Sequence, residues 1–359
     1  MEDKGYGFLA IIIIWGGLFY LFSASPIAPS ASAGSGSFSA ATFSALGGFF
    51  NDGGGSNEPF GFIDEKGVFQ KSQAHFDNTP NISQIEISLS DPSLIFAASN
   101  NGLLASKNGG LNWYSFFDIE HKLNGVTVYK ILFNPENKNQ SFVSVFSGGK
   151  GMVYKSENNF LSVEKLIEFN SEGVYDFSIK NGDLYLGLSN GKLIVYSLER
   201  NESRILTAFS SPIIGLIIPP NGNLIYLTLK SGGLYLSYDK GLSFSRLKSL
   251  DSYKSANKIN GLFVSPNDSF SIYAATSYGL LRSFDAGATW KVFKSLPSET
   301  ASISAVAINS NGEIFAVSNG KIYKSRDNGQ NWQIIEINFG AEISVIAFNG
   351  EQVIIGAGN

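Results

Sequence analysis

The sequence predicts an all-β protein, a seven-bladed β-propeller in which strands from both ends of the domain complete one blade. Three observations lead to this prediction: the composition, a short motif that recurs along the chain, and incomplete sets of strands at the two ends. The 359 residues include 39 Gly, 29 Phe and 15 Tyr, and only 16% are charged. Such a composition suits turns and pleated, half-buried strands.

An eight-residue motif occurs four times. Its Asp or Asn oxygen can accept hydrogen bonds from backbone N–H groups in a tight turn, and its glycine supplies a positive φ. Its aromatic residue is expected to fold under the sheet, where burial of about 150–250 Å² at roughly 25 cal/mol per Å² contributes several kcal/mol. The motif is therefore predicted to close the outer hairpin of a blade. The four copies are Ser106, Asn108, Gly110 and Trp113; Ser237, Asp239, Gly241 and Phe244; Ser283, Asp285, Gly287 and Trp290; and Ser325, Asp327, Gly329 and Trp332.

These segments resemble the Asp-box, also called the bacterial neuraminidase repeat, whose form is S-x-D-x-G-x-[TS]-W. The resemblance covers residues 60–359 and implies a propeller similar to those of sialidases, xyloglucanases, sortilin-type receptors and photosystem II assembly factors. It does not choose among their activities, because one fold serves many functions. The box acids Asp239, Asp285 and Asp327 are interpreted as structural, in preference to a catalytic or calcium-binding role.

The number of blades follows from the strand before each box. Every box serine ends a strand that starts at a glycine, and the same pattern indicates three further blades at Gly67–Ser72, Gly151–Ser156 and Gly191–Ser197. The seven serines, at 72, 106, 156, 197, 237, 283 and 325, predict seven blades.

The two ends of the domain predict one shared blade. Ile343–Phe348 and Gln352–Gly356 have the pattern of a first and a second strand, after which a third is due. Gly67–Ser72 and the residues up to Phe76 are expected to be a third and a fourth strand with no first and second before them. Strands from both ends should therefore complete one blade, which leaves no long open sheet edge.

Residues 1–24 are expected to form a membrane anchor. The apolar run over residues 7–24 is just long enough to cross a bilayer core of roughly 30 Å, so we expect an N-terminal transmembrane helix that contacts the membrane. A cleaved signal peptide is the alternative, because Ala31-Ser32-Ala33 resembles a cleavage site.

A linker is predicted between this segment and the propeller. Residues 25–59 are rich in Ser, Ala and Gly, which is typical of a flexible coil, and residues 60–359 form the expected propeller. No basic residue follows the apolar run until Lys66, so the propeller is predicted to lie outside the cytoplasm, in the periplasm or at the cell surface. If the segment is cleaved, the protein is secreted.

Charge and residue counts argue against several classes of ligand. A net charge of −4 and a pI near 5.4 argue against a nucleic-acid partner. The absence of cysteine excludes a disulfide, a thiolate metal site and a cysteine nucleophile. With His75 and His121 as the only histidines, we predict no metal and no cofactor.

No catalytic set is recognisable. Sialidases of the resembling group have a Phe-Arg-Ile-Pro segment and three arginines that bind the substrate, and no arginine of this chain lies in such a segment. Other glycosidases need two carboxylates at a defined separation, which the sequence does not give for the loop acids Asp64, Glu65, Asp118, Glu120 and Glu172.

The sequence therefore predicts a non-enzymatic binding or assembly scaffold for protein partners. The alternative is a glycan-binding or glycoside-hydrolase (sialidase-like) surface protein. A role in photosystem assembly is a narrower form of the scaffold hypothesis.

Partner contacts are expected on the loops opposite the box turns. The longest are Asp118–Val126 and Asp251–Asn260, and exposed aromatic residues beside lysines suit contact with a protein or a glycan. Ordinary solvated loops are the alternative interpretation. The candidate residues are His121, Lys122, Tyr253, Lys254, Lys258 and Tyr278.

Overall fold

The part of the chain that the computed structural model describes lies within the propeller. It comprises residues 59–76, 79–219, 223–265, 268–293, 296, 301–309, 311–339 and 341–357. The predicted membrane segment, residues 7–24, and nearly all of the predicted linker lie outside it, so the boundaries at residues 24 and 59 stay predictions. Within the described residues, no helix is long and apolar enough to cross a membrane.

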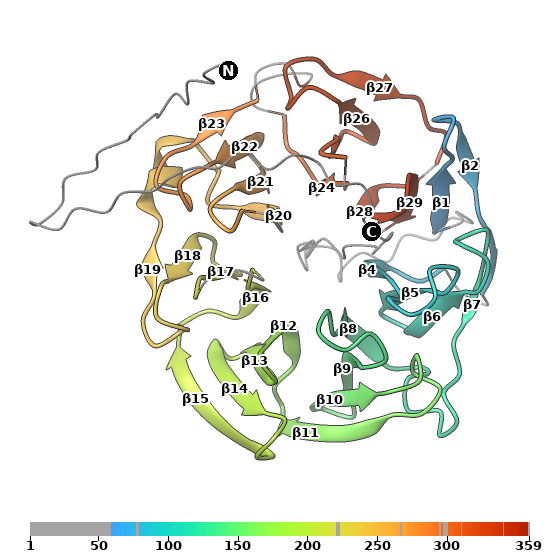
Figure 1. The fold of residues 1–359 in the computed structure, drawn as a ribbon, viewed down its shortest axis with the longest axis vertical. Coiled ribbons are helices and arrows are strands. Elements are labelled where there is room, and N and C mark those ends of the chain that lie inside the picture. The colour runs from blue at the N-terminus through green and yellow to red at the C-terminus, as the bar shows by residue number, and fades with distance from the viewer. Residues whose placement is uncertain are drawn as a thin grey trace, which may run out of the picture. The chain divides into compact units, whose positions relative to one another are not determined.

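Seven sheets surround a common axis, and each contains one blade of four antiparallel strands (Figure 1). The first strand of each blade lies nearest the axis and the fourth lies at the perimeter. The predicted all-β, seven-bladed propeller is confirmed. We number the blades as blade 1 (β28, β29, β1, β2), blade 2 (β4 to β7), blade 3 (β8 to β11), blade 4 (β12 to β15), blade 5 (β16 to β19), blade 6 (β20 to β23) and blade 7 (β24 to β27).

The strands are short, as expected for blades. The first strands are β28 (Ile343–Asn349), β4 (Ile82–Ile87), β8 (Thr127–Phe133), β12 (Val174–Lys180), β16 (Ile213–Ile217), β20 (Ile259–Val264) and β24 (Ala305–Ile308). The second strands are β29 (Gln352–Ala357), β5 (Ile95–Ser99), β9 (Ser141–Ser147), β13 (Asp183–Leu188), β17 (Ile225–Leu229), β21 (Ile272–Thr276) and β25 (Ile314–Ser318). The third strands are β1 (Phe60–Ile63), β6 (Gly102–Ser106), β10 (Lys150–Ser156), β14 (Lys192–Ser197), β18 (Leu234–Ser237), β22 (Leu280–Ser283) and β26 (Lys321–Ser325). The fourth strands are β2 (Phe69–Lys71), β7 (Asn112–Ser115), β11 (Glu164–Asn170), β15 (Glu202–Ala208), β19 (Ser245–Arg246), β23 (Lys291–Val292) and β27 (Gln333–Ile335).

Blade 1 is built from both ends of the domain. Its strand order is β2-β1-β29-β28, and β1 pairs antiparallel with β29 from Phe60↔Gly356 to Ile63↔Val353. The predicted composite blade is therefore confirmed, and it closes the ring without a long open edge between the ends.

The predicted position of the third strand in this blade is wrong. The third strand is β1, whereas the segment from Gly67 to Ser72 contains the end of a turn and the fourth strand. The turn begins at Asp64, whose Oδ1 accepts hydrogen bonds from Lys66 N (3.0 Å) and Val68 N (2.9 Å). A box serine likewise accepts hydrogen bonds from the backbone N–H groups two and four residues ahead of it. Asp64 therefore takes the place of the box serine in blade 1, and a search for serines could not find this turn.

Ser72, which was expected to anchor a blade, instead connects two blades. Its hydroxyl donates to the carbonyl oxygen of Gly110 in the box turn of blade 2 (2.6 Å), and the strand that follows it, β3 (Gln73–His75), pairs parallel with β7. Ser249 repeats this contact between blades 5 and 6, where it donates to the carbonyl oxygen of Gly287 (2.5 Å). Ser249 lies in a short 3-10 helix, Lys248–Ser252.

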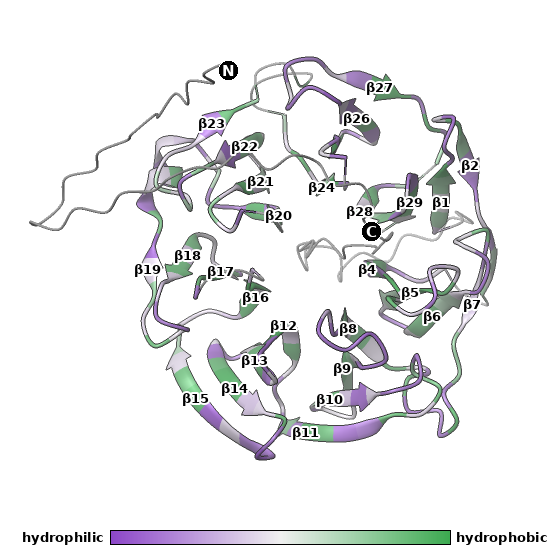
Figure 2. Ribbon diagram, in the orientation of Figure 1, coloured by the Kyte–Doolittle hydropathy of each residue, from purple (hydrophilic) through white to green (hydrophobic). Residues whose placement is uncertain are grey.

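Apolar side chains fill the space between neighbouring blades. The inner strands are mostly hydrophobic and the turns mostly hydrophilic in Figure 2, and β5 and β17 are buried along their whole length. Phe60 of β1 stacks on Trp113 of blade 2, with 3.8 Å between ring centroids and an interplanar angle of 5°. The N-terminal strand therefore packs against blade 2 as well as pairing with β29.

Polar contacts near the axis join each blade to the next. From blade 6 to blade 2, a side chain at the start of a first strand donates to a backbone carbonyl of the following blade: Asn260 to Ile303, Ser304 to Ile343 and Ser344 to Ile82. From blade 2 to blade 5 the groups are larger: Gln84 bonds both backbone groups of Ile131, Lys130 pairs with Asp176, and Asp176 accepts from Leu216 N. Between blades 5 and 6 the bond instead comes from a second strand, where the Tyr226 hydroxyl of β17 donates to Ser269 O.

Candidate functional site

The ring has two faces that differ in their connections. One, which we call the box face, has the turns between first and second strands and between third and fourth strands. The other, the loop face, has the turns between second and third strands and the connections from one blade to the next. Pro59 and Ala357, which are hydrogen-bonded to each other, both lie on the loop face.

The predicted box residues form hydrogen-bonded turns. Ser237 Oγ accepts from Asp239 N (3.3 Å) and Gly241 N (2.8 Å) and donates to Asp239 Oδ1 (2.7 Å), while Asp239 Oδ1 accepts from Ser243 N (2.9 Å). The turns at Ser106, Ser283 and Ser325 have the same bonds. The glycines Gly110, Gly241, Gly287 and Gly329 all have positive φ.

The aromatic residues of the boxes pack to different depths. Trp113 and Trp290 are buried, and Trp113 Nε1 donates to Gly110 O (3.0 Å). Phe244 and Trp332 are half-buried. The most deeply buried aromatic residue of the boxes is therefore Trp113, on which Phe60 also stacks.

The carboxylates of the box acids accept hydrogen bonds within their own turns. Hydrogen bonds, the largest contribution coming from the Ser243 hydroxyl, lower the pKa of Asp239 to about 2. Hydrogen bonds led by the backbone N–H of Asn331 lower the pKa of Asp327 to about 2. A carboxylate held ionised by its own turn is poorly suited to proton transfer near neutral pH.

A fifth box turn escaped the sequence analysis. In blade 3, Ser156 Oγ accepts from Asn158 N (3.3 Å) and Phe160 N (2.9 Å), and Asn158 Oδ1 accepts from Ser162 N (3.0 Å). Phe160 stands where the other boxes have glycine; it has a φ of +64° and a fully buried side chain. The motif is not visible in the sequence because a buried phenylalanine occupies the position of the glycine.

Four of the five acids that were candidates for hydrolysis have contacts within the protein. Asp64 belongs to the turn of blade 1, Asp118 is buried with Oδ1 accepting from Leu123 N (2.9 Å), and Glu120 pairs with Lys122. Glu172 accepts from Asn190 on a different connection, and Glu65 is exposed beside Asp64. In the described part of the chain, no group of three or more His, Asp or Glu residues is placed to hold a metal ion.

The six predicted contact residues lie on the loop face but in two separate places. His121 and Lys122 belong to the connection between blades 2 and 3, and the other four belong to blades 5 and 6, on the opposite side of the ring (Figure 1). His121 is exposed and its ring lies 5.7 Å from that of Phe117. The ion pair with Glu120 raises the pKa of Lys122, whose ammonium group also lies 5.9 Å from the ring of Tyr154. Lys122 is thus already engaged within the loop.

The remaining four residues are two tyrosines and two lysines on neighbouring segments of blades 5 and 6. The rings of Tyr253 and Tyr278 lie 5.5 Å apart, edge to face, and both pack against the core between blades 5 and 6. The Tyr253 hydroxyl donates to Trp290 O (2.8 Å). Lys254 and Lys258 are exposed on the same connection.

A fifth residue, Lys230, joins this group. It is exposed on the short turn between β17 and β18, and that turn lies against the connection because Gly233 N donates to Asn257 O (2.7 Å). Ser277 N, beside Tyr278, donates to Lys258 O (3.1 Å). We call these five residues, Lys230, Tyr253, Lys254, Lys258 and Tyr278, the lysine–tyrosine patch. Sequence analysis missed Lys230 because it lies on a short turn of another blade.

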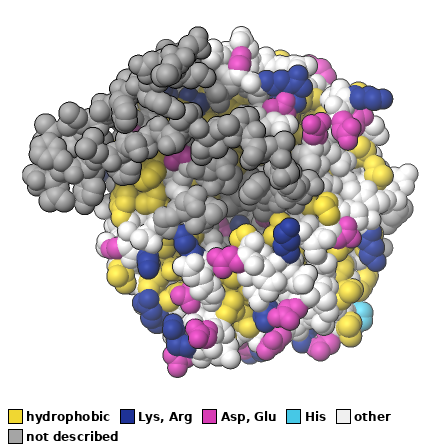
Figure 3. Space-filling model, in the orientation of Figure 1, with side chains coloured by type: hydrophobic (Ala, Val, Ile, Leu, Met, Phe, Trp, Pro, Cys, Tyr) yellow, Lys and Arg dark blue, Asp and Glu magenta, His cyan; other side chains and the backbone are white. Residues whose placement is uncertain are grey.

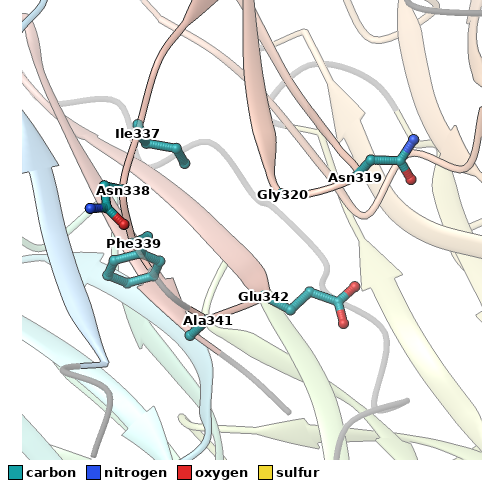
Figure 4. A pocket seen from close by; sticks show the side chains of 7 residues that line it. All are labelled: Asn319, Gly320, Ile337, Asn338, Phe339, Ala341 and Glu342. Carbon is teal, nitrogen blue, oxygen red and sulfur yellow. The ribbon is translucent and has the colours of Figure 1, made fainter.

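Two other features of the loop face were also missed. Tyr129 and Tyr175, near the start of β8 and β12, lie 4.9 Å apart, and burial raises the pKa of Tyr129 to about 12. They stand where other blades have the small polar side chains that join neighbouring blades. An open pocket of about 470 Å³ lies between blades 7 and 1 (Figure 4) and is lined by Asn319, Gly320, Ile337, Asn338, Phe339, Ala341 and Glu342.

Charges on the face seen in Figure 3 are interspersed, with Lys and Arg next to Asp and Glu over much of the visible rim. Such mixing gives no broad surface of one sign on this face. The lysines of the patch form no ion pair with the carboxylates of the described chain.

Comparison with known proteins shows similarity of fold. No protein-family model matches the chain, and no curated protein matches its sequence. YCF48 bound to a D1 peptide has 11% identity and a TM-score of 0.59, covering 88% of this chain and 100% of that chain. YCF48 from Cyanidioschyzon merolae has 13% identity and a TM-score of 0.61, covering 83% and 99%.

Propellers of other kinds are similar to about the same degree. The WD40 propeller domain of Doa1 has 13% identity and a TM-score of 0.57, covering 83% of this chain and 94% of that chain. An ancestral GH74 enzyme has 15% identity and a TM-score of 0.58, covering 74% of this chain and 42% of that chain. Identities this low show the fold alone, so the chain is a seven-bladed β-propeller whose function must be argued from its own residues.

Proposed function

We propose that this protein is a non-enzymatic, membrane-tethered, extracytoplasmic scaffold that binds a protein partner through the lysine–tyrosine patch. The observation that supports this most is the gathering of three exposed lysines, without ion pairs in the described chain, around an ordered pair of tyrosines. Tyrosines held in place are typical anchors of protein-binding surfaces, and exposed charges beside them can be complemented by charges of a partner.

The patch is ordered before any partner arrives. The bond from Tyr253 to Trp290 O and the packing of both tyrosines on the core fix the rings. A surface that is already ordered loses less conformational entropy on binding. The YCF48 structure in complex with a D1 peptide is an example of a propeller of similar fold with a peptide ligand.

The proposal also covers the family to which the box turns point and the cellular location of the protein. The five box turns, with their shared serine and Asp or Asn bonds, support membership of the Asp-box group of propellers. The apolar run at residues 7–24 supports a membrane anchor, with the cleaved signal peptide as the alternative. Protease treatment of intact cells, followed by detection of the full-length chain and of a form lacking residues 1–24, tests the predicted location.

A charge-reversal experiment tests the scaffold function. The full chain is purified from the membranes of the cells that make it, as wild type, as the Lys254→Glu/Lys258→Glu variant and as the Lys66→Glu/Lys107→Glu control, whose lysines lie on the box face. We expect one protein to co-purify with wild type and control but not with the patch variant. Equal recovery with all three would contradict the proposed surface.

A glycan-acting protein is the second candidate, favoured by the half-buried tyrosine pair and by the fold the chain shares with a GH74 enzyme. The contacts that engage Asp64, Asp118, Glu120 and Glu172 argue against hydrolysis, since cleavage needs two available carboxylates across one bond. A panel of aryl glycosides and sialosides tests it, and turnover that disappears on changing one loop carboxylate would overturn the non-enzymatic proposal.

A further inference from the structure

We infer that the lysine–tyrosine patch binds an acidic polypeptide segment, one rich in Asp and Glu side chains. This inference rests on the proposed function and specifies the chemistry of the partner. Its basis is a local excess of positive charge on a chain whose net charge is −4.

The three lysines of the patch form no ion pair within the described chain. Six other lysines of the described chain do pair with acids: Lys122 with Glu120, Lys130 with Asp176, Lys150 and Lys165 with Glu168, Lys155 with Glu157, and Lys324 with Glu313. The acid nearest in sequence to Lys254 is Asp251, which is engaged by both terminal nitrogens of Arg246 at 2.7 Å. The three lysines are therefore available to carboxylates from outside.

The backbone around the patch presents these lysines in a fixed arrangement. Ala256 N donates to Tyr253 O (3.0 Å), Lys258 N donates to Ser255 O (3.2 Å), and the side chain of Ala256 is buried. Gly233 and Ser277 bond the same connection from its two sides. Lysines from two neighbouring turns thus lie on hydrogen-bonded backbone next to the segments that carry the tyrosine pair, which suits a peptide that lies across several residues.

A polypeptide fits this surface better than a lipid membrane does. Recognition of anionic lipids commonly uses clusters of four to eight Lys or Arg, or exposed apolar side chains that enter the bilayer, and the patch has three lysines. The four large apolar side chains that are most exposed in the described chain lie elsewhere, Phe117 and Ile119 on the connection before blade 3 and Tyr238 and Leu242 on the box face. The tyrosines instead offer partly exposed rings on which a peptide backbone and its side chains can pack.

Fluorescence anisotropy with a synthetic peptide tests the inference. The probe is a labelled ten-residue peptide of alternating Glu and Ser, its control is the same peptide with Gln in place of Glu, and the protein is the detergent-solubilised full chain. We expect the Glu peptide to bind and the Gln peptide to bind at least tenfold more weakly. Binding should also weaken several-fold between 50 and 200 mM salt, since exposed ion pairs are screened by salt.

Matched variants assign the binding to the patch. Lys230→Gln/Lys254→Gln/Lys258→Gln is expected to lower affinity about tenfold or more, and Lys→Arg at the same positions is expected to keep it. Lys66→Gln/Lys107→Gln/Lys240→Gln, on the box face, should bind as wild type does. Equal binding of the two peptides, or of the patch variant and wild type, would overturn the inference.

Two further outcomes separate this inference from the proposed function. Binding of phosphatidylglycerol vesicles through the same three lysines, without binding of the Glu peptide, would identify a lipid surface and overturn it. Co-purification of a protein that depends on Lys254 and Lys258 and binds through a segment without acidic residues would overturn the acidic partner while leaving the scaffold function intact.

Discussion

Lys130 and Asp176 form a buried ion pair between blades 3 and 4, with 3.0 Å between Nζ and Oδ1. Asp176 also accepts hydrogen bonds from the backbone N–H groups of Phe177 and Leu216, so one carboxylate contacts three blades. Burial raises the pKa of Asp176, because the ionised form loses hydration. Removing only one partner of a buried ion pair lowers stability, because the other charge is left unpaired.

Removing the cation alone is therefore expected to destabilise the ring. Lys130→Met should lower the free energy of unfolding by about 3–5 kcal/mol, because it leaves a buried charge unpaired. Lys130→Met/Asp176→Asn should recover part of the loss, since the Asn oxygen is neutral and can still accept from Leu216 N. Denaturant unfolding of both variants checks the prediction, and a double variant less stable than the single one would contradict it.

Acid should weaken the box turns. The pKa values of Asp239 and Asp327 are about 2 in the folded chain against an ordinary value of 3.8. Because the unfolded chain binds protons more readily, the stabilisation from these groups is present above about pH 4 and is lost as the pH falls towards 2.

The Asp239→Asn/Asp327→Asn variant should show a shallower loss of stability between pH 4 and pH 2 than wild type. Glu351→Gln, an exposed acid outside the box turns, serves as the control. Unfolding midpoints measured at several pH values check this, and parallel curves for wild type and the double variant would count against the assigned role of the two carboxylates.

Phe160 should tolerate glycine better than alanine. Its φ of +64° strains any residue with a Cβ, at roughly 1–2 kcal/mol, while its buried ring contributes to the core. Phe160→Ala should cost about 3–5 kcal/mol of unfolding free energy, since it loses the ring and keeps the strain. Phe160→Gly should cost about 1 kcal/mol less than Phe160→Ala. Denaturant unfolding checks this, and a glycine variant less stable than the alanine variant would contradict backbone strain at this position.

Both ends of the domain should be required for a closed ring. Deleting residues 1–76 removes β1, β2 and β3 and the stacking of Phe60 on Trp113, so we expect an aggregating or unfolded product. Deleting residues 1–58 should leave a folded, soluble propeller. Circular dichroism and thermal unfolding distinguish the two, and a folded product with an unchanged melting temperature from the longer deletion would contradict closure through β1.

The repeat predicted the blade count and the composite blade because box turns need particular residues at fixed positions. It misplaced one strand because Asp64 can accept the two backbone bonds that serine usually accepts, and it missed the box at Ser156 because Phe160 replaces glycine. The contacts near the axis were not predictable, since Gln84, Lys130 and Asp176 are ordinary polar residues until neighbouring blades meet. The same holds for Lys230, which joins the patch through contacts between blades 5 and 6.

The central claim is that this propeller binds a protein through the patch on its loop face. Site-specific photocrosslinking in the cells that make the protein tests it most directly, with the photoreactive residue at Asn257, which lies between Lys254 and Lys258 on the same connection, or at Gln330, on the box face; both positions are exposed. We predict a crosslinked protein at Asn257 that disappears in the Lys254→Glu/Lys258→Glu background, and none at Gln330. Crosslinking at Gln330 alone, or at neither position, would contradict it.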